Sequence, residues 1–228
     1  MIDYQDFIYK LNMLGIDYKK TKNIVKKANG EVAYFFPYDS SLNILLIPDD
    51  FNTFNNLCKH NPWSFSISRN NNVKVIGGAN LTETPGMFQF IDADSLIDLT
   101  DFGMRSVTNA SHMFQFCECE EICFPKDFPL HIKNMFCMFN ECHVKRLDLS
   151  MLKANAFTET DGMFYNAKIE EALILSPSLA KKYTLSKLLC HLFDFSKEQL
   201  REVLGQNLRN PDFEKIRELT GVRIEIKK

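Results

Sequence analysis

Residues 81–88 read LTETPGMF, and residues 157–164 repeat this octapeptide almost unchanged as FTETDGMF. Both copies end in Met-Phe, and the same dipeptide also occurs between them. It begins at Met87, Met113, Met138 and Met163, at spacings of 26, 25 and 25 residues. A fixed period of this length indicates a repeat architecture whose units stack on one another. The chain is therefore predicted to contain a solenoid of about four 25-residue coils.

Each period carries further apolar positions in phase with Met-Phe. A short strand of apolar-x-apolar pattern follows each pair, as in Ile97-Asp98-Leu99 and Leu147-Asp148-Leu149. A shifted copy of this strand occupies residues 172–175, and residues 73–75 form a strand that precedes the repeats. Stacked coils align equivalent residues, so we expect Met and Phe to form two columns inside the core. Two further columns are predicted, at Leu81, Val107, Ile132 and Phe157 before the Met, and at Ile91, Cys117, Cys142 and Ala167 after it.

One copy of the repeat resembles a known family. The segment Met138-Phe139-Asn140-Glu141-Cys142, followed by Leu147-Asp148-Leu149-Ser150, is similar to the repeat of the BspA-like leucine-rich-repeat proteins, Met-Phe-x-x-Cys and then Leu-x-Leu-Ser. The resemblance covers roughly residues 73–180. It implies a leucine-rich-repeat solenoid that acts as a binding scaffold and has no catalytic residues. The family is common on bacterial surfaces, whereas this chain begins with acidic residues that are not typical of a secretion signal.

Segments of different character flank the repeats. The predicted fold class is therefore α+β: a short leucine-rich-repeat solenoid of about four 25-residue coils, with an N-terminal α/β cap and a C-terminal helical cap. We place the N-terminal cap at residues 1–62, the solenoid at residues 63–180 and the helical cap at residues 181–228.

The N-terminal cap is predicted from helical and strand patterns. Apolar spacing favours a helix from Tyr4 to Leu14, a second over residues 18–28 and a third over residues 51–58. The stretches EVAYFFP and LNILLIP read as two strands around the turn YDSS.

The C-terminal cap is predicted from helix signals. Leu185, Leu188, Leu189 and Leu192 share one helical stripe. Ser196-Lys197-Glu198-Gln199 is a capping box, and Asn210-Pro211 places a cap and a first-turn proline before the next helix. Val222, Ile224 and Ile226 alternate as a last strand.

The balance of charge argues against a protein that coats nucleic acid or an anionic membrane. The chain has 27 basic and 29 acidic residues, and so lacks the basic field such proteins need. Five lysines on the predicted helix 18–28 could contact phosphates, but a solvated face is the more common use of such a run, so a nucleic-acid partner is not favoured. The five lysines are Lys19, Lys20, Lys22, Lys26 and Lys27. No apolar run approaches the roughly 18 residues of a membrane span, so we expect a cytoplasmic protein.

Catalysis and metal binding are not expected. None of the 7 cysteines lies in a Cys-x-x-Cys pair, and Cys117 and Cys142 share a repeat position with Ile91 and Ala167. We therefore predict reduced thiols that fill space in the core, with no zinc and no cofactor. The 5 histidines stand in no recognisable catalytic motif.

The predicted function is that of a non-catalytic intracellular scaffold which binds a protein partner. Strand side chains alternate, so Asp98, Cys123 and Asp148, together with Leu173, should point outward in one column. Arg146 in the next column is expected to offset the repulsion between the two aspartates. The candidate binding residues are Asp98, Glu121, Cys123, Lys126, Arg146, Asp148 and Ser150. An alternative is an inhibitor encoded by a virus or mobile element that blocks a host nucleic-acid-processing or defence complex by occlusion.

Overall fold

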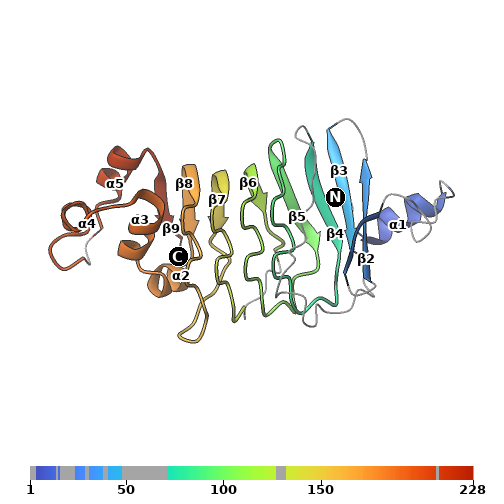
Figure 1. Ribbon diagram of the computed structural model, residues 1–228, viewed down its shortest axis with the longest axis horizontal. Helices are drawn as coiled ribbons and strands as arrows, with labels where there is room; N and C mark the ends of the chain where they lie inside the picture. Colours follow the sequence, from blue (N-terminus) through green and yellow to red (C-terminus); the bar gives the residue numbers. More distant parts are fainter. Residues whose placement is uncertain are drawn as a thin grey trace.

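The chain folds into a solenoid built on one continuous sheet, with helices at both ends (Figure 1). The computed structural model describes residues 4–13, 15, 24–28, 31–37, 41–47, 71–126, 132–208 and 211–227. Over these residues, the sheet has 9 strands in the order β1-β2-β3-β4-β5-β6-β7-β8-β9. Strands β1, β2 and β3 pair antiparallel, and every later pairing is parallel. The predicted fold, a short repeat solenoid with a helical C-terminal part, is confirmed.

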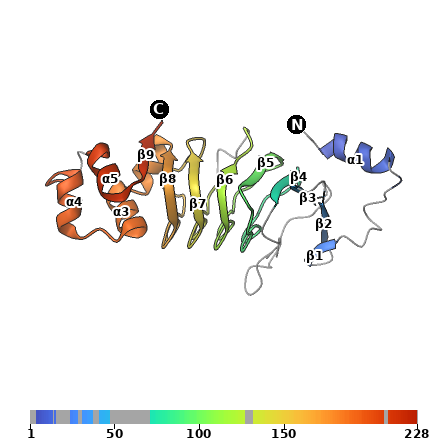
Figure 2. The same ribbon diagram turned by 90° about the horizontal axis from the view of Figure 1, so that it is seen from above.

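The strands run from β1 (Ile24–Ala28), β2 (Glu31–Pro37) and β3 (Leu42–Ile47) through β4 (Asn72–Gly77), β5 (Leu96–Phe102), β6 (Glu118–Cys123), β7 (His143–Leu149) and β8 (Lys168–Leu175) to β9 (Arg223–Ile226). The helices are α1 (Tyr4–Met13), α2 (Pro177–Lys182), α3 (Leu185–Phe193), α4 (Lys197–Leu204) and α5 (Phe213–Thr220). Helices α2 to α5 lie between β8 and β9 in the chain, so β9 returns from the helical cap to extend the sheet (Figure 2).

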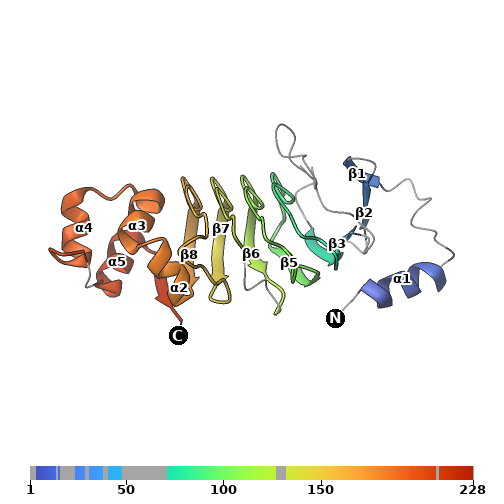
Figure 3. The same ribbon diagram turned by 90° about the horizontal axis from the view of Figure 1, so that it is seen from below.

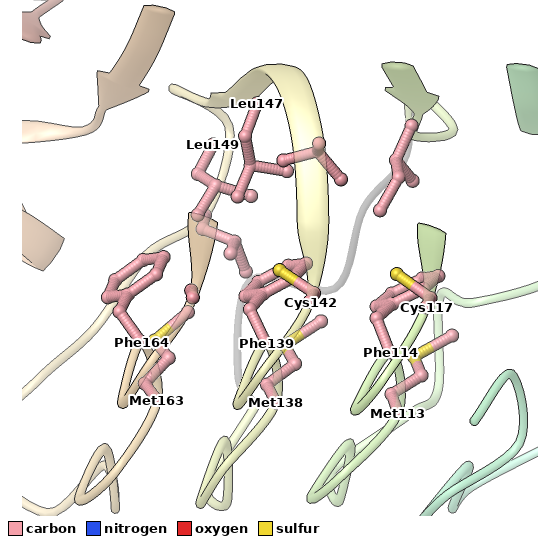
Figure 4. Close-up of a cluster of buried hydrophobic side chains, with 14 of the residues drawn as sticks. Met113, Phe114, Cys117, Met138, Phe139, Cys142, Leu147, Leu149, Met163 and Phe164 are labelled. Atoms are coloured by element: carbon pink, nitrogen blue, oxygen red, sulfur yellow. The ribbon is translucent and has the colours of Figure 1, made fainter. Parts of the chain in front are cut away.

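The core consists of stacked columns of equivalent residues, as predicted. Each Met-Phe pair is fully buried, and Cys117 and Cys142 lie directly above the rings in a third column (Figure 4). Phe114 and Phe139 stack with ring centroids 5.4 Å apart, and Phe139 and Phe164 stack at 5.8 Å. Tyr183 ends the column with its ring edge against Phe164, at 5.2 Å and 85°. This aromatic stack joins the solenoid to the helical cap.

Two tight turns per coil reverse the chain around each Met-Phe pair. The residue before Met and the residue three after it both have positive φ in every coil. Glycine occupies this position before Met87 and Met163, whereas His112 and Cys137 adopt it in the middle coils with φ of 57° and 53°. Backbone hydrogen bonds between neighbouring coils, such as Phe114 N–H to the Met138 carbonyl at 2.9 Å, hold these turns in register. The regular stacking therefore offsets the cost of the left-handed residues.

A row of side-chain amides runs along the solenoid beside the turns. Gln89 Nε2 donates to Gln115 Oε1 at 2.6 Å, and Gln115 Nε2 donates to Asn140 Oδ1 at 2.5 Å. Asn140 Nδ2 then donates to the Tyr165 carbonyl at 2.9 Å. Gln89 and Asn140 are buried, and these bonds satisfy their amide nitrogens, which would otherwise be costly in the core, while Gln89 Oε1 makes no hydrogen bond with the described residues.

The predicted core position of Phe157 is wrong. Leu81, Val107 and Ile132 are buried as expected, but Phe157 is 94% exposed. The turn before it is closed by Asn155, whose Oδ1 accepts from Phe157 N–H at 2.8 Å. Thr158 fills the interior instead, because its hydroxyl can donate to the Ile132 carbonyl of the preceding coil, 3.4 Å away.

The N-terminal cap follows the strand predictions but not all the helix predictions. Strands β2 and β3 occupy the two expected stretches and pair antiparallel, and α1 ends at Met13. The predicted helix over residues 18–28 is wrong where the structure describes it, because β1 is a strand. Its backbone can pair with β2, and a tertiary partner of this kind overrides helical spacing. The predicted helix over residues 51–58 lies outside the described residues.

The helical cap confirms the capping box and corrects one helix start. Ser196 Oγ accepts from Gln199 N–H, and the Gln199 side chain accepts from Ser196 N–H at 2.9 Å. Helix α5, however, is capped by Asp212, whose Oδ1 accepts from Lys215 N–H at 3.0 Å. The cap therefore lies two residues beyond the predicted Asn210, and Pro211 precedes the helix. Within the described ranges, no helix is long and apolar enough to cross a membrane.

Candidate protein-binding surface

The outward side of the sheet over β5 to β8 is the candidate site, and we call it the strand face. Helix α1 covers this side of the sheet over β2 to β4, where Phe7 and Leu11 pack with Tyr34, Ile44 and Ile76. In the register of the sheet, Ile44 lies beside Lys74, Lys74 beside Asp98, and Asp98 beside Cys123. This side of the sheet is therefore apolar under α1 and carries charged residues from β4 onward.

Asp98 lies on the strand face as predicted, but it is held by a buried cation. Lys74 is 6% exposed, and its Nζ lies 2.8 Å from Asp98 Oδ2 and 2.7 Å from Asp101 Oδ2. A register shift in the β4–β5 pairing places both aspartates on this side of the sheet. Burial alone would raise the pKa of Asp98, but hydrogen bonds from Lys74 and Thr100 outweigh it and lower the pKa.

Asp148 occupies the equivalent position in β7 and is held in a similar way. Ser150 N–H donates to Asp148 Oδ1 at 2.9 Å, and Lys227 Nζ lies 2.8 Å from Asp148 Oδ2. Burial would raise the pKa of Asp148, and the hydrogen bonds from Lys227 and Ser150 reverse the direction and lower it. Ser150 therefore positions Asp148, as Thr100 positions Asp98.

Two details of the predicted column are wrong. Leu173 is fully buried beside Leu147, and the residue beside Asp148 is Ile174. The reason is an irregularity in the β7–β8 pairing, which changes the alternation of β8. Arg146 makes no ion pair with the residues that the structure describes, and the counter-charges of the two aspartates are Lys74 and Lys227.

The other candidate residues are not all together. Glu121 is half-buried and pairs in register with Arg146, which places Cys123 beside Asp148 two residues further on. Lys126 lies on the exposed turn after β6, where it lines a separate open depression of about 620 Å³ with Asp101 and others. The strand face therefore brings together six of the seven predicted residues, and Lys126 lies apart from them on the turn after β6.

Sequence reasoning missed an acidic depression at the amino-terminal ends of β6 and β7. Its volume is about 290 Å³, and its lining includes Asp92, Asp94, Glu118, Glu120 and His143. Asp92, Glu118 and His143 lie side by side in the sheet. Each of these three residues is the fifth after the Met of a Met-Phe pair. The repeat spacing could therefore have predicted that they lie together.

Ion pairs cross the strand face but leave carboxylates in excess. Glu120 bonds to Lys145 of the next coil, and His143 Nε2 lies 2.7 Å from Glu170 Oε1. Asp94, Glu121 and Glu171 make no ion pair within the described part of the chain. Across β5 to β8 the acidic side chains are Asp98, Asp101, Glu118, Glu120, Glu121, Asp148, Glu170 and Glu171, and the Lys and Arg side chains are Lys145, Arg146 and Lys168. Lys74 and Lys227, which pair with Asp98 and Asp148, come from outside these strands.

The described cysteines form no disulfide with one another, and the described histidines make hydrogen bonds to nearby side chains. The cysteines that the structure describes are free thiols, and no group of three or more Cys, His, Asp or Glu in those residues could hold a metal ion. His112, His143 and His191 bond to Gln115, Glu170 and Tyr183 respectively. Of the five lysines considered as phosphate contacts and not favoured for that role, Lys19, Lys20 and Lys22 lie outside the described residues, while Lys26 and Lys27 fall in β1.

Comparisons of the chain with protein-family models, with curated proteins and with solved structures gave no match.

Proposed function

We propose that the chain is a non-catalytic scaffold that binds a protein partner carrying basic groups, and that the strand face is the contact surface. The observation that supports this most directly is the excess of carboxylates on neighbouring coils of one open sheet face. The hydrogen-bonded strands fix the backbone positions from which these carboxylates project. The backbone of the array therefore loses little conformational entropy when a partner binds.

The charges fit a macromolecule better than a small ligand. Neighbouring strands lie about 4.8 Å apart, so carboxylates on adjacent coils act within one Debye length, about 8 Å at physiological salt. Their fields therefore add over the surface, and a basic partner gains in association rate as well as affinity. The paired aspartates, Asp98 and Asp148, contribute less to this field, because Lys74 and Lys227 already neutralise them.

The bonding of the described histidines supports a non-catalytic role. A serine or cysteine nucleophile needs a base within hydrogen-bonding distance. His112, His143 and His191 bond to an amide, a carboxylate and a phenol instead. In the described ranges, none of these three has a serine or cysteine as hydrogen-bond partner.

The test is affinity capture from the native host, identified by mass spectrometry, with matched variants of the full chain. Asp94→Lys combined with Glu121→Lys reverses two unpaired charges without touching the Lys74 or Lys227 pairs. Glu198→Lys with Glu214→Lys makes the same change of charge on the helical cap, where both side chains are exposed. The wild type and the cap variant should capture the same partner, in a salt-sensitive manner, and the strand-face variant should lose it. Equal capture by both variants contradicts the proposal.

The same acidic surface is the one observation that favours the alternative, an inhibitor acting by occlusion. Duplex DNA carries one negative charge per roughly 1.7 Å of helix axis, and a row of carboxylates on a rigid sheet can occupy a basic groove meant for it. Once a partner has been captured, a competition experiment distinguishes the two proposed functions. Duplex DNA should displace the chain from the partner if the partner's nucleic-acid groove is the target, and should leave the complex intact otherwise.

A further inference from the structure

The helical cap contains a groove that is lined by basic side chains, whereas the strand face has an excess of acidic ones. Residues of α3 and α4 line the groove, and its volume is about 570 Å³. Figure 3 shows these two helices at the end of the molecule beyond β8. Lys187 and Cys190 line it from α3, and Lys197, Leu200 and Arg201 line it from α4. Leu208, from the turn after α4, completes the wall. No acidic residue is part of this lining within the described chain.

The cations of the groove are available to a ligand. Lys187 is already bound, because its Nζ lies 2.5 Å from Asp161 Oδ1. Lys197 and Arg201 are exposed and make no ion pair with the residues that the structure describes. They stand one helical turn apart on the same face of α4, which is suited to carboxylates on one face of a partner segment.

The apolar part of the groove is also open. Leu208 is 43% exposed and has a φ of 54°, a left-handed conformation that is uncommon for leucine. Both features cost stability in a free monomer. An apolar side chain of a partner, packed against Leu208 and Leu200, would remove exposed apolar surface from water.

We propose that the groove between α3 and α4 binds an acidic amphipathic segment of a partner protein, with its apolar side chains on Leu200 and Leu208 and its carboxylates facing Lys197 and Arg201. A peptide fits better than a nucleic acid, because the cations are few and Leu200 and Leu208 are aliphatic. The one aromatic ring in the described lining is His191, which is held at its Nδ1 by the Tyr183 hydroxyl, so there is no row of rings on which successive bases could stack. The groove lies apart from the strand face, and the two surfaces should bind partners of opposite charge. The chain would then hold two segments of unlike charge at two separate places.

The binding test uses fluorescence anisotropy with the full chain and a labelled peptide of about 16 residues, in which leucines at helical spacing alternate with glutamates. A peptide with lysine in place of every glutamate is the charge control. The acidic peptide should bind, more weakly as salt rises, and the lysine peptide should not bind the groove. Lys197→Glu with Arg201→Glu should weaken binding by about tenfold or more. Lys133→Glu with Lys153→Glu, an equal change on exposed lysines of the solenoid, should leave it within about twofold.

A second variant separates binding from folding. Leu208→Asn removes the apolar contact at a position whose positive φ asparagine accepts readily, so the protein should be at least as stable as the wild type. It should nevertheless bind the acidic peptide several-fold more weakly. If this variant binds the peptide with unchanged affinity, the proposed binding position of the peptide is wrong.

Cys190 reports the location of binding without any mutation. This thiol is exposed and lines the groove, so the acidic peptide should slow its alkylation, mapped by mass spectrometry, while Cys123 reacts at an unchanged rate. The Asp94→Lys/Glu121→Lys variant should show the same protection, which separates this proposal from the strand-face function. No binding of the acidic peptide, no protection of Cys190, or tighter binding of a labelled oligo-dT of similar length would each overturn the proposal.

Discussion

The ring of Phe139 lies parallel to that of Phe114, with an interplanar angle of 3° and centroids 5.4 Å apart. Both rings are fully buried, and hydrogen-bonded coils on both sides prevent the backbone from closing a gap. Phe139→Ala should therefore destabilise the protein by about 3–5 kcal/mol, measured by chemical denaturation. Phe157→Ala is the control, because that ring is 94% exposed and its loss should change stability by less than about 0.5 kcal/mol. Similar losses in both variants would contradict the stacked core.

Lys74 should be required for folding stability, because it neutralises two carboxylates at once. Lys74→Met retains the apolar stem but leaves Asp98 and Asp101 without their cation. Breaking a buried pair in this way should cost about 3–5 kcal/mol. The triple variant with Asp98→Asn and Asp101→Asn should recover part of the loss. A Lys74→Met protein as stable as the wild type would show that the pair contributes nothing to folding.

The two paired aspartates should make the protein less stable in acid. The pKa values of Asp98 and Asp148 are lowered from 3.8 in the folded chain, so the unfolded state binds protons more readily. Their contribution is fully present above the unfolded pKa and is lost as the pH falls through the folded values. In Asp98→Asn/Asp148→Asn, stability should change less below about pH 4 than in the wild type. The measurement is urea denaturation over a pH series, and an unchanged slope in the variant would argue against the pairing.

His191 should give a second, separate pH dependence. Its Nδ1 lies 2.6 Å from the Tyr183 hydroxyl, whose pKa burial raises to about 12. Burial and then the charge of Lys187 lower the pKa of His191 from 6.5, so protonation favours the unfolded state. Stability should therefore decrease as the pH falls below about 6.5. His191→Gln keeps a group able to bond to Tyr183 and should reduce this slope in thermal unfolding, whereas a slope as steep as that of the wild type would mean that another group is responsible.

The repeat part of the fold could be predicted from the sequence because its signal is periodic. Met138 and Phe139 recur at equivalent positions in four coils, and stacking gives equivalent positions equivalent environments. The capping box at Ser196 could also be predicted, because it depends on residues within one helical turn. On the strand face, alternation correctly placed Asp98, Cys123 and Asp148.

The errors lie where the periodicity fails or where distant residues decide. Leu173 was assigned to the wrong face because an irregularity in the β7–β8 pairing changes the alternation, and residues 24–28 form a strand because β2 is available to pair with them. Lys74 stands in a visible Val-Lys-Val alternation, so its place beside Asp98 could have been found.

The sequence by itself determined the coil, its period, its inward residues and the outward direction of the charged column. Only the tertiary structure decided which charges remain free on that column. Lys227 lies 79 residues from Asp148 in the chain and reaches it only because β9 returns through four helices to pair with β8. The groove between α3 and α4 likewise exists only once both helices have packed. Periodicity reports environments that neighbouring coils repeat, whereas an ion pair or a groove depends on the single path by which distant segments meet.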